Sequence, residues 1–266
     1  MFIYLKQCIR LAIYTIVLNS YSGISLAQEE QQSTQALSIA AYHARGNFGL
    51  PEQTEISYLP LRYEFDNANW GFQLLMPHLQ VQGPGAVLIN LGGVSRAVAG
   101  SEVRTESGLG DVVGSLIYHL PARSATSPFI DLRFDVKLPT ADKNEGLGTG
   151  ETDYSLQLDI SQYWRDWILF GSVGYTYRGN SSLFPDLESG GFAQLGAAKP
   201  LDESLSLGFI YDYRQRATSF TSDIHELGPY LNWQFNESWS ITALTMAGFT
   251  DASSDFSVLA QLRYSW

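Results

Sequence analysis

The stretch that decides the fold is residues 129–159, FIDLRFDVKLPTADKNEGLGTGETDYSLQLD. Residues 130–138 alternate strictly between apolar and charged side chains, and this period of two places each set on its own face of a β-strand. The polar, Gly-rich run 139–152 predicts a loop. Alternation resumes over residues 154–161, so the stretch predicts two long strands joined by a flexible loop.

One face of this predicted hairpin is apolar and the other is polar. A transmembrane β-barrel needs this pattern, with the apolar face toward lipid and the polar face toward a wet lumen. A soluble antiparallel sheet with one wet face would show the same pattern. The hairpin alone leaves both interpretations open, and the rest of the chain favours the barrel.

Residues 1–27 read as a secretory signal peptide, with Lys6 and Arg10 before a short apolar run and Ser25-Leu26-Ala27 as the cleavage site. No later run of about 18 apolar residues predicts a transmembrane helix. The only cysteine, Cys8, lies inside this segment, so the mature chain has no disulfide, Cys metal site or thiol nucleophile. Residues 28–266 are expected to form a single outer-membrane β-barrel domain.

Composition agrees with this interpretation. The chain has 27 acidic and 16 basic residues and a net charge of −11, which becomes −13 when the two cations of the signal segment are removed. Such a chain is a poor binder of nucleic acid. The 15 Tyr, 14 Phe and 24 Gly residues fit a barrel whose apolar and polar faces cancel in the mean hydropathy.

The alternation predicts an all-β, transmembrane, antiparallel up-and-down barrel of about 12 strands. The expected strands are residues 36–44, 55–65, 70–81, 110–120, 129–138, 154–163, 168–177, 190–199, 204–216, 224–235, 238–249 and 255–266. Short connections alternate with longer ones, as periplasmic turns alternate with extracellular loops. Residues 82–109 are expected to form a folded loop that dips into the lumen, although residues 86–91 are apolar enough for a strand.

All tryptophans fall at the periplasmic strand ends of this topology. Indole rings prefer the membrane interface, so these residues are expected to form an aromatic belt: Trp70, Trp164, Trp167, Trp233, Trp239 and Trp266. The last strand alternates to its final aromatic residue, a feature that the barrel-assembly machinery of the outer membrane reads. Expected partners are this machinery, membrane lipid, lipopolysaccharide and a small-molecule solute, but no nucleic acid.

Strand parity also predicts which charged and polar side chains line the lumen. The set is Arg62, Glu64, Asp111, Asp131, Arg133, Asp135, Lys137, Gln157, Asp159, Asp212, Arg214, Arg216, Glu226 and Arg263. Neighbouring opposite charges in it are expected to pair, because cross-strand partners lie about 5 Å apart.

Two sequence blocks resemble a known family. They are Gly108-Leu109-Gly110-Asp111 and the run 137–150, KLPTADKNEGLGTG, followed by Asp153-Tyr154. The chain resembles the outer-membrane transporter family named for the meta-pathway of phenol degradation over nearly the whole mature length. One departure is Ala141, where the family pattern has Gly. The resemblance implies a transporter, and the family name reflects gene association.

Patterns for catalysis and for metal binding are weak. The four histidines lie on different predicted strands, and none forms a His-x-x-x-His or His-Glu-x-x-His pattern. His225, beside Glu226 near the outer rim, is the best candidate base for a lipid-modifying enzyme, but no serine is clearly paired with it. The oxygen-bearing loop residues Asp142, Asn144, Glu145, Glu151 and Asp153 do not follow EF-hand spacing and favour a solvated loop over a Ca²⁺ site.

The sequence therefore predicts a channel or transporter for small solutes, with aromatic or hydrophobic compounds among the candidates. No catalytic activity, cofactor or metal is expected. A barrel of this size lies between small filled barrels and open porins, so its lumen should be narrow. The alternatives are a non-conducting structural or adhesive barrel that binds partners through its loops, and a rim enzyme acting on lipid.

Overall fold

The computed structural model describes residues 33–266 apart from 49–51, 85–86, 91–92, 97–102, 123, 125–126, 183, 185 and 220. The predicted signal peptide lies outside the described residues. No helix in the described part of the chain is long and apolar enough to cross a membrane. The strands are β1 (Thr34–Gly46), β2 (Thr54–Asp66), β3 (Trp70–Pro84), β4 (Val87–Asn90), β5 (Gly93–Arg96), β6 (Val103–Leu109), β7 (Val112–Leu120), β8 (Phe129–Leu138), β9 (Asp153–Trp164), β10 (Trp167–Tyr177), β11 (Gly190–Pro200), β12 (Leu205–Arg214), β13 (Ile224–Gln234), β14 (Trp239–Gly248) and β15 (Phe256–Ser265).

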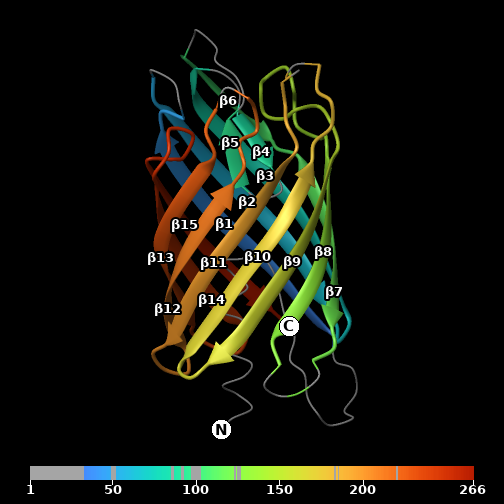
Figure 1. Cartoon of the computed structure of the whole chain (residues 1–266), viewed down its shortest axis with the longest axis vertical. Helices are drawn as coiled ribbons and strands as arrows, with labels where there is room; N and C mark the ends of the chain where they lie inside the picture. Colours follow the sequence, from blue (N-terminus) through green and yellow to red (C-terminus); the bar gives the residue numbers. More distant parts are fainter. Residues whose placement is uncertain are drawn as a thin grey trace.

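Twelve of these strands close into an antiparallel barrel (Figure 1). The ring runs β1, β2, β3, β7 and then in chain order to β15, which pairs with β1. Ala36 shows the closure, since its Cα partners are Ser265 on β15 and Glu64 on β2. The prediction of an all-β, up-and-down barrel of about 12 strands is confirmed.

The segment 82–109 was wrongly expected to be a loop. β3 continues to Pro84, and β6 pairs with this extension from His78↔Leu109 to Pro84↔Val103. Farther along, β7 pairs with the same β3 from Leu75↔Val113 to Trp70↔Tyr118. Between these pairings three residues, Gly110 to Val112, face two residues of β3, so β6 and β7 share one position in the ring and are separated by a β-bulge.

Within the apolar stretch 86–91, β4 (Val87–Asn90) is a strand that does not change the barrel count. β4 and β5 form their own two-stranded sheet, with pairs from Val87↔Arg96 to Asn90↔Gly93. The expectation that this segment dips into the lumen stays a prediction.

The two ends of the barrel differ. One end, here called the turn end, carries the short connections 67–69, 165–166, 201–204 and 235–238. The opposite end, the loop end, carries 47–53, 139–152, 178–189, 215–223 and 249–255 (Figure 1). Within each strand, alternate side chains point to the inner and to the outer face of the barrel. The depth of a residue is given below by the number of residues that separate it from the turn end of its strand.

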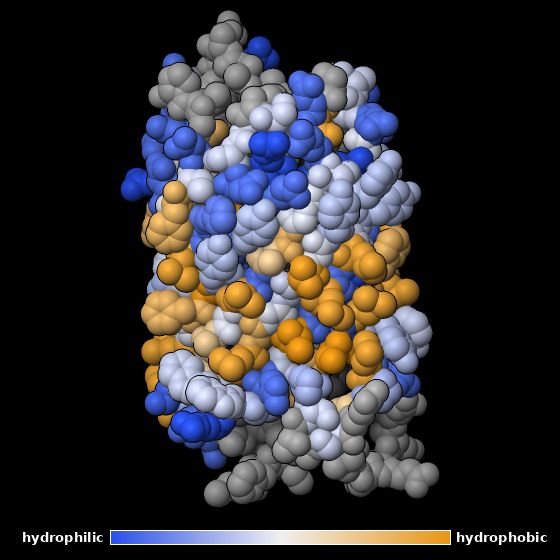
Figure 2. Space-filling view, in the orientation of Figure 1, coloured by the Kyte–Doolittle hydropathy of each residue, from blue (hydrophilic) through white to orange (hydrophobic). Residues whose placement is uncertain are grey.

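The outer face exposes large apolar side chains that a protein in water would bury. Leu156 is 54% exposed, Val173 57% and Phe209 61%. On the face that Figure 2 shows, hydrophobic side chains form a band across the middle and lower part of the barrel, beneath a hydrophilic upper part. A continuous exposed apolar band on a closed barrel is the surface that outer-membrane barrels present to lipid.

Candidate functional site

The inner face is rich in buried charge. Eleven residues of the predicted lumen set are buried: Arg62, Glu64, Asp111, Asp131, Arg133, Asp135, Lys137, Asp159, Asp212, Glu226 and Arg263. Gln157 and Arg214 are partly buried at inner positions of β9 and β12. Arg214 pairs with Asp212 at 2.8 Å. A soluble protein seldom buries so many charges, because each needs a partner to offset its desolvation.

Arg216 lies beyond the end of its strand, and its place on the inner wall stays a prediction. β12 ends at Arg214, so strand parity does not extend to Arg216. Its side chain is 46% exposed in the connection to β13 and lies 3.6 Å from Glu188.

Arg133 links three strands of the charged wall. Its Nε donates to Asp135 Oδ1 at 2.6 Å, its Nη1 to Gln73 Oε1 on β3 at 3.2 Å, and its Nη2 to Ser115 Oγ on β7 at 2.8 Å. Gln73 and Ser115 are buried at inner positions. The planar guanidinium has donors on several sides, which suits it to hold three neighbouring strands at once.

A second charged group lies nearer the turn end. Arg263 Nε donates to Glu64 Oε2 at 3.0 Å, which joins β15 to β2 across β1. Arg62 Nη1 lies 3.8 Å from Glu64 Oε1, too far for a hydrogen bond. Glu64 is therefore shared between two arginines, and Arg263 has the closer contact.

His119 is a functional candidate that sequence reasoning missed. Its Nδ1 lies 3.0 Å from Asp131 Oδ1 and its Nε2 lies 3.2 Å from Asp66 Oδ1. A Cβ at Gly71 would come within 2.6 Å of the Asp66 Oδ1 atom, so glycine leaves room for this contact. Strand parity in the sequence could have indicated these residues, because His119 and Asp66 have the same parity as the predicted inner residues of their strands.

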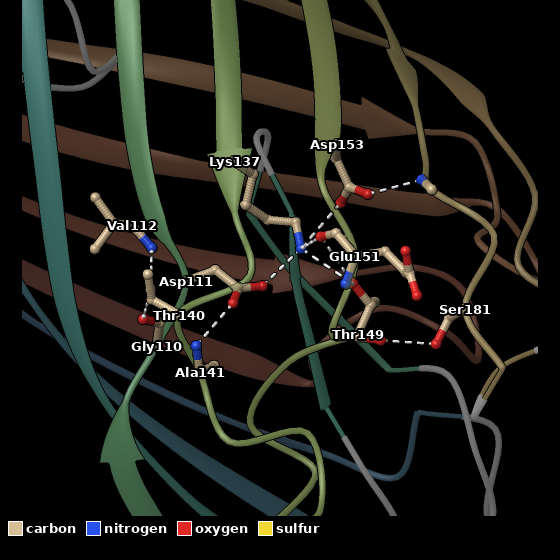
Figure 3. A network of polar contacts seen from close by, with 11 residues as sticks. Gly110, Asp111, Val112, Lys137, Thr140, Ala141, Thr149, Glu151, Asp153 and Ser181 are labelled. Atoms are coloured by element: carbon tan, nitrogen blue, oxygen red, sulfur yellow. Dashed lines mark hydrogen bonds and ion pairs between the residues drawn. The ribbon is translucent and has the colours of Figure 1, made fainter.

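At the loop end, Lys137 is the centre of a polar network (Figure 3). Its Nζ lies 2.6 Å from Asp111 Oδ2, 3.1 Å from Thr149 Oγ1, 3.1 Å from the Glu151 carbonyl oxygen and 3.3 Å from Asp153 Oδ2. The Lys137 side chain is only 1% exposed. Two carboxylates and two neutral oxygens thus offset the burial of one ammonium group.

The bulge before β7 directs Asp111 into this network. Gly110 and Asp111 are successive residues that are both buried, which regular strand alternation would not allow. Asp111 Oδ1 accepts from the Ala141 N–H at 3.0 Å. Thr140 Oγ1 accepts from the Val112 N–H at 2.9 Å and donates to the Gly110 carbonyl at 3.0 Å, so the loop after β8 is bonded to the bulge at several points.

The same loop inserts an apolar side chain into the barrel. Leu147 is 1% exposed and belongs to a buried cluster with Phe48, Ile56, Leu79, Val81 and Ala141. A Cβ at Gly148 would lie 2.8 Å from the Ala141 Cβ and 3.0 Å from both Asp111 carboxylate oxygens. The loop 139–152 therefore folds inward over the inner faces of β2 and β3, and its glycines allow the close approach.

The loop acids do not gather around a common point. Asp153 faces Lys137 and also accepts from the Gly179 N–H at 3.0 Å, while Glu151 enters the network through its carbonyl group. Asp142 Oδ1 accepts from the Asn144 N–H at 2.8 Å. Within the described ranges, no group of three or more His, Cys, Asp or Glu side chains is arranged to hold a metal ion.

A second wall of the lumen contains an apolar cluster, which sequence reasoning also missed. Inner residues of β10 to β14 form a buried cluster that consists of Ile168, Phe170, Ala198, Ile210, Tyr230 and Met246. A Cβ at Gly196 would lie 2.2 Å from the Phe170 ring, and a Cβ at Gly208 would lie 2.5 Å from the Tyr230 ring. Both rings therefore lie against the backbone of a neighbouring strand. The sequence feature that could have indicated this cluster is the run WILF at 167–170, where apolar residues occupy both faces of the strand instead of alternating with polar ones.

His225 has a tyrosine as its side-chain partner. Its Nδ1 lies 2.7 Å from Tyr211 Oη. Ser222 Oγ accepts from the Ala252 N–H at 3.2 Å. The hydroxyl that meets the imidazole is thus phenolic, and this pair does not make a serine nucleophile with its base.

The tryptophans lie as a group at the turn end. Each is at or next to a strand end there, and all are at least 36% exposed: Trp70, Trp164, Trp167, Trp233, Trp239 and Trp266. Their contact with a membrane interface stays a prediction.

Comparison with known proteins extends these findings. An outer membrane channel from Pseudomonas putida F1 matches with a TM-score of 0.67 and 12% identity, over 93% of this chain and 100% of that one. The KdgM porin matches with a TM-score of 0.51 and 11% identity, over 86% and 99%. At these identities the matches show a shared fold. No curated protein matches by sequence. A family model described as "Putative MetA-pathway of phenol degradation" matches residues 28–266. The chain is therefore a member of this family and has the fold of an outer-membrane barrel.

Proposed function

We propose that this barrel lets small solutes cross the bacterial outer membrane. The observation that carries the proposal is the closed ring of twelve strands with buried charged residues inside and exposed apolar residues outside. Such a wall separates a polar interior from lipid. Membership of the family and the shared fold with an outer membrane channel support the same conclusion.

The two walls of the interior bear on the solute. The charged wall on β2, β3, β7 and β8 is bonded within itself, as the contacts of Arg133 show. The wall on β10 to β14 offers the aromatic rings of Phe170 and Tyr230. Small aromatic or otherwise apolar solutes that carry a polar group suit an interior of this composition.

The test is electrical and osmotic. The folded protein is added to a planar lipid bilayer, and proteoliposomes are used for swelling assays with sugars and small aromatic compounds. Discrete conductance steps and swelling are expected. Silence in both assays, with correctly folded protein, would refute a conducting role and favour the structural or adhesive alternative.

Export and assembly complete the proposal. We infer that residues 1–27 are removed as a signal peptide and that the barrel-assembly machinery inserts residues 28–266. The loop end faces the cell exterior, where lipopolysaccharide is a neighbour, and the tryptophans of the turn end lie at the periplasmic interface. Membrane-interface placement is supported by their common exposure at one end of the barrel.

A further inference from the structure

Arg62 is the least satisfied charge of the inner wall. Its side chain is 6% exposed, and its Nη1 atom has no hydrogen-bond acceptor in the described part of the chain. The carboxylate that attracts it is Glu64 at 3.8 Å, which already accepts from Arg263 at 3.0 Å. The positive charges of Arg133 and Arg263 act on it as well. A buried guanidinium in this position favours an additional anion.

An apolar surface lies elsewhere on the inner wall, at a similar number of residues from the turn end. Arg62 lies four residues before the turn-end terminus of β2, Asp66, and Tyr230 lies four residues before that of β13, Gln234. Four barrel positions separate these strands, since the ring passes from β2 through β1, β15 and β14 to β13. Tyr230 packs against Phe170 with ring centroids 6.2 Å apart.

The Tyr230 hydroxyl is itself without a partner. Tyr230 Oη is buried and has no hydrogen-bond partner among the described residues. Two unsatisfied donors, a guanidinium N–H and a phenolic O–H, are thus held inside the barrel, and the phenolic one belongs to a ring packed against Phe170. Unpaired buried donors are costly, and a ligand that accepts from them removes the cost.

We propose that Arg62 is an anion-binding residue of the solute path and that the solute class is a small carboxylate with an apolar or aromatic body. The carboxylate accepts from Arg62, and the apolar body lies against the wall that contains Phe170 and Tyr230. A guanidinium matches the geometry of a carboxylate with parallel N–H donors. This inference rests on the proposed solute path and names the chemistry that the path selects.

The test compares an anion with a neutral compound of the same shape. Binding of radiolabelled benzoate and of benzyl alcohol to the folded full barrel is measured by equilibrium dialysis. Arg62→Gln should weaken benzoate binding by about tenfold or more, because a hydrogen bond to a charged group is worth at least that factor. It should leave benzyl alcohol binding unchanged. Glu64→Gln should strengthen benzoate binding, because it frees two guanidinium groups.

Arg216→Gln is the matched control, since it removes the same charge from an exposed loop position. The heat-modifiable mobility of the barrel on a gel reports whether each variant is folded. If Arg62→Gln fails to fold, it is replaced by Arg62→Lys, which keeps the charge. Arg62→Lys should retain part of the preference for benzoate. Equal benzoate binding by wild type and Arg62→Gln overturns the site. Conductance is recorded separately. Conductance steps without Arg62-dependent binding of benzoate would overturn the anion site but would still support the proposed channel. Arg62-dependent binding without conductance steps would support the anion site but would contradict conduction.

Discussion

Lys137 Nζ lies 2.6 Å from Asp111 Oδ2, and the other oxygen of Asp111 accepts from the Ala141 N–H. One carboxylate therefore joins the end of β8, the bulge before β7 and the loop that folds into the barrel. Ala141, the residue that departs from the family pattern, contributes through its backbone, so this bond does not depend on its side chain.

Lys137→Met should release this loop. The substitution leaves Asp111 and Asp153 buried without their cation, and breaking a buried ion pair costs on the order of 3 kcal/mol. Hydrogen exchange at amides 141–151 should accelerate strongly. Lys143→Met, at an exposed position of the same loop, is the control and should change little. Unchanged protection in Lys137→Met would show that the network does not hold the loop.

Labelling tests the orientation of the barrel. Asn144 and Asp202 are exposed at opposite ends, and the only native cysteine lies in the predicted signal peptide. On intact cells an impermeant maleimide should label Asn144→Cys but not Asp202→Cys. Lysed cells should label both. The reverse pattern on intact cells would place the loop end in the periplasm.

Neighbouring residues of β8 should respond in opposite ways to the same new charge. Arg133 is buried on the inner face, whereas Leu132 is 43% exposed on the outer face. Arg133→Glu should still insert, because its new charge faces the lumen, although loss of the Asp135 pair lowers the stability of the barrel. It should shift the reversal potential toward cation preference in a salt gradient. Leu132→Glu should impair insertion, at a cost of about 2 kcal/mol or less near mid-membrane. Equal assembly and an unchanged reversal potential in both would contradict the assignment of faces.

Removal of Trp266 should impair closure. Trp266 and Gln35 exchange two backbone hydrogen bonds of 3.0 Å, which extend the β1–β15 seam, and the indole stacks on Tyr264 at 5.4 Å. The deleted form should reach the outer membrane at a reduced level, as measured by membrane fractionation. Trp266→Phe keeps the backbone hydrogen bonds and an aromatic ring, so it should assemble better than the chain that lacks residue 266.

The turn that contains Asp202 should lose stability in acid. Hydrogen bonds from the Ser204 N–H and hydroxyl and from the Leu205 N–H lower the pKa of this exposed carboxyl. The ionised carboxyl therefore stabilises the turn fully at pH values above its pKa in the unfolded chain, near 3.9. This stabilisation is lost as the pH falls through the lower pKa of the folded state. The Ser204 and Leu205 amide NMR shifts should titrate in that acidic range. In Asp202→Asn these shifts should be independent of pH there.

Alternation predicts the strands that lie in the apolar band, because only there does one face need lipid-compatible residues. β6 was missed for the same reason: its outer residues Thr105 and Ser107 are polar, so VRTESGL carries no apolar period. The inward fold of the loop was hidden because Leu147 is a single apolar residue among glycines. Its partners, Ile56 and Leu79, are distant in sequence and come together only when the ring closes.

The charged inner positions followed from parity alone, but their partners did not. Glu64 and Arg263 are 199 residues apart, and their contact depends on which strands meet at the seam. Parity carries no information beyond the end of a strand, and Arg216 lies two residues past the end of β12.

The ring that lies over Gly196 makes the calibre of the bore adjustable by a single methyl group. At Gly196 an added Cβ would lie 2.2 Å from the Phe170 ring, so alanine must tip this ring away from the wall, whereas at Gly208 the added Cβ would also lie 2.5 Å from the Ala197 carbonyl oxygen, which a tipped ring does not relieve. A tipped ring projects toward the axis and narrows the passage without a change in strand number or charge. Related chains could thus sieve molecules of different girth by exchanging glycine and alanine at the position of Gly196.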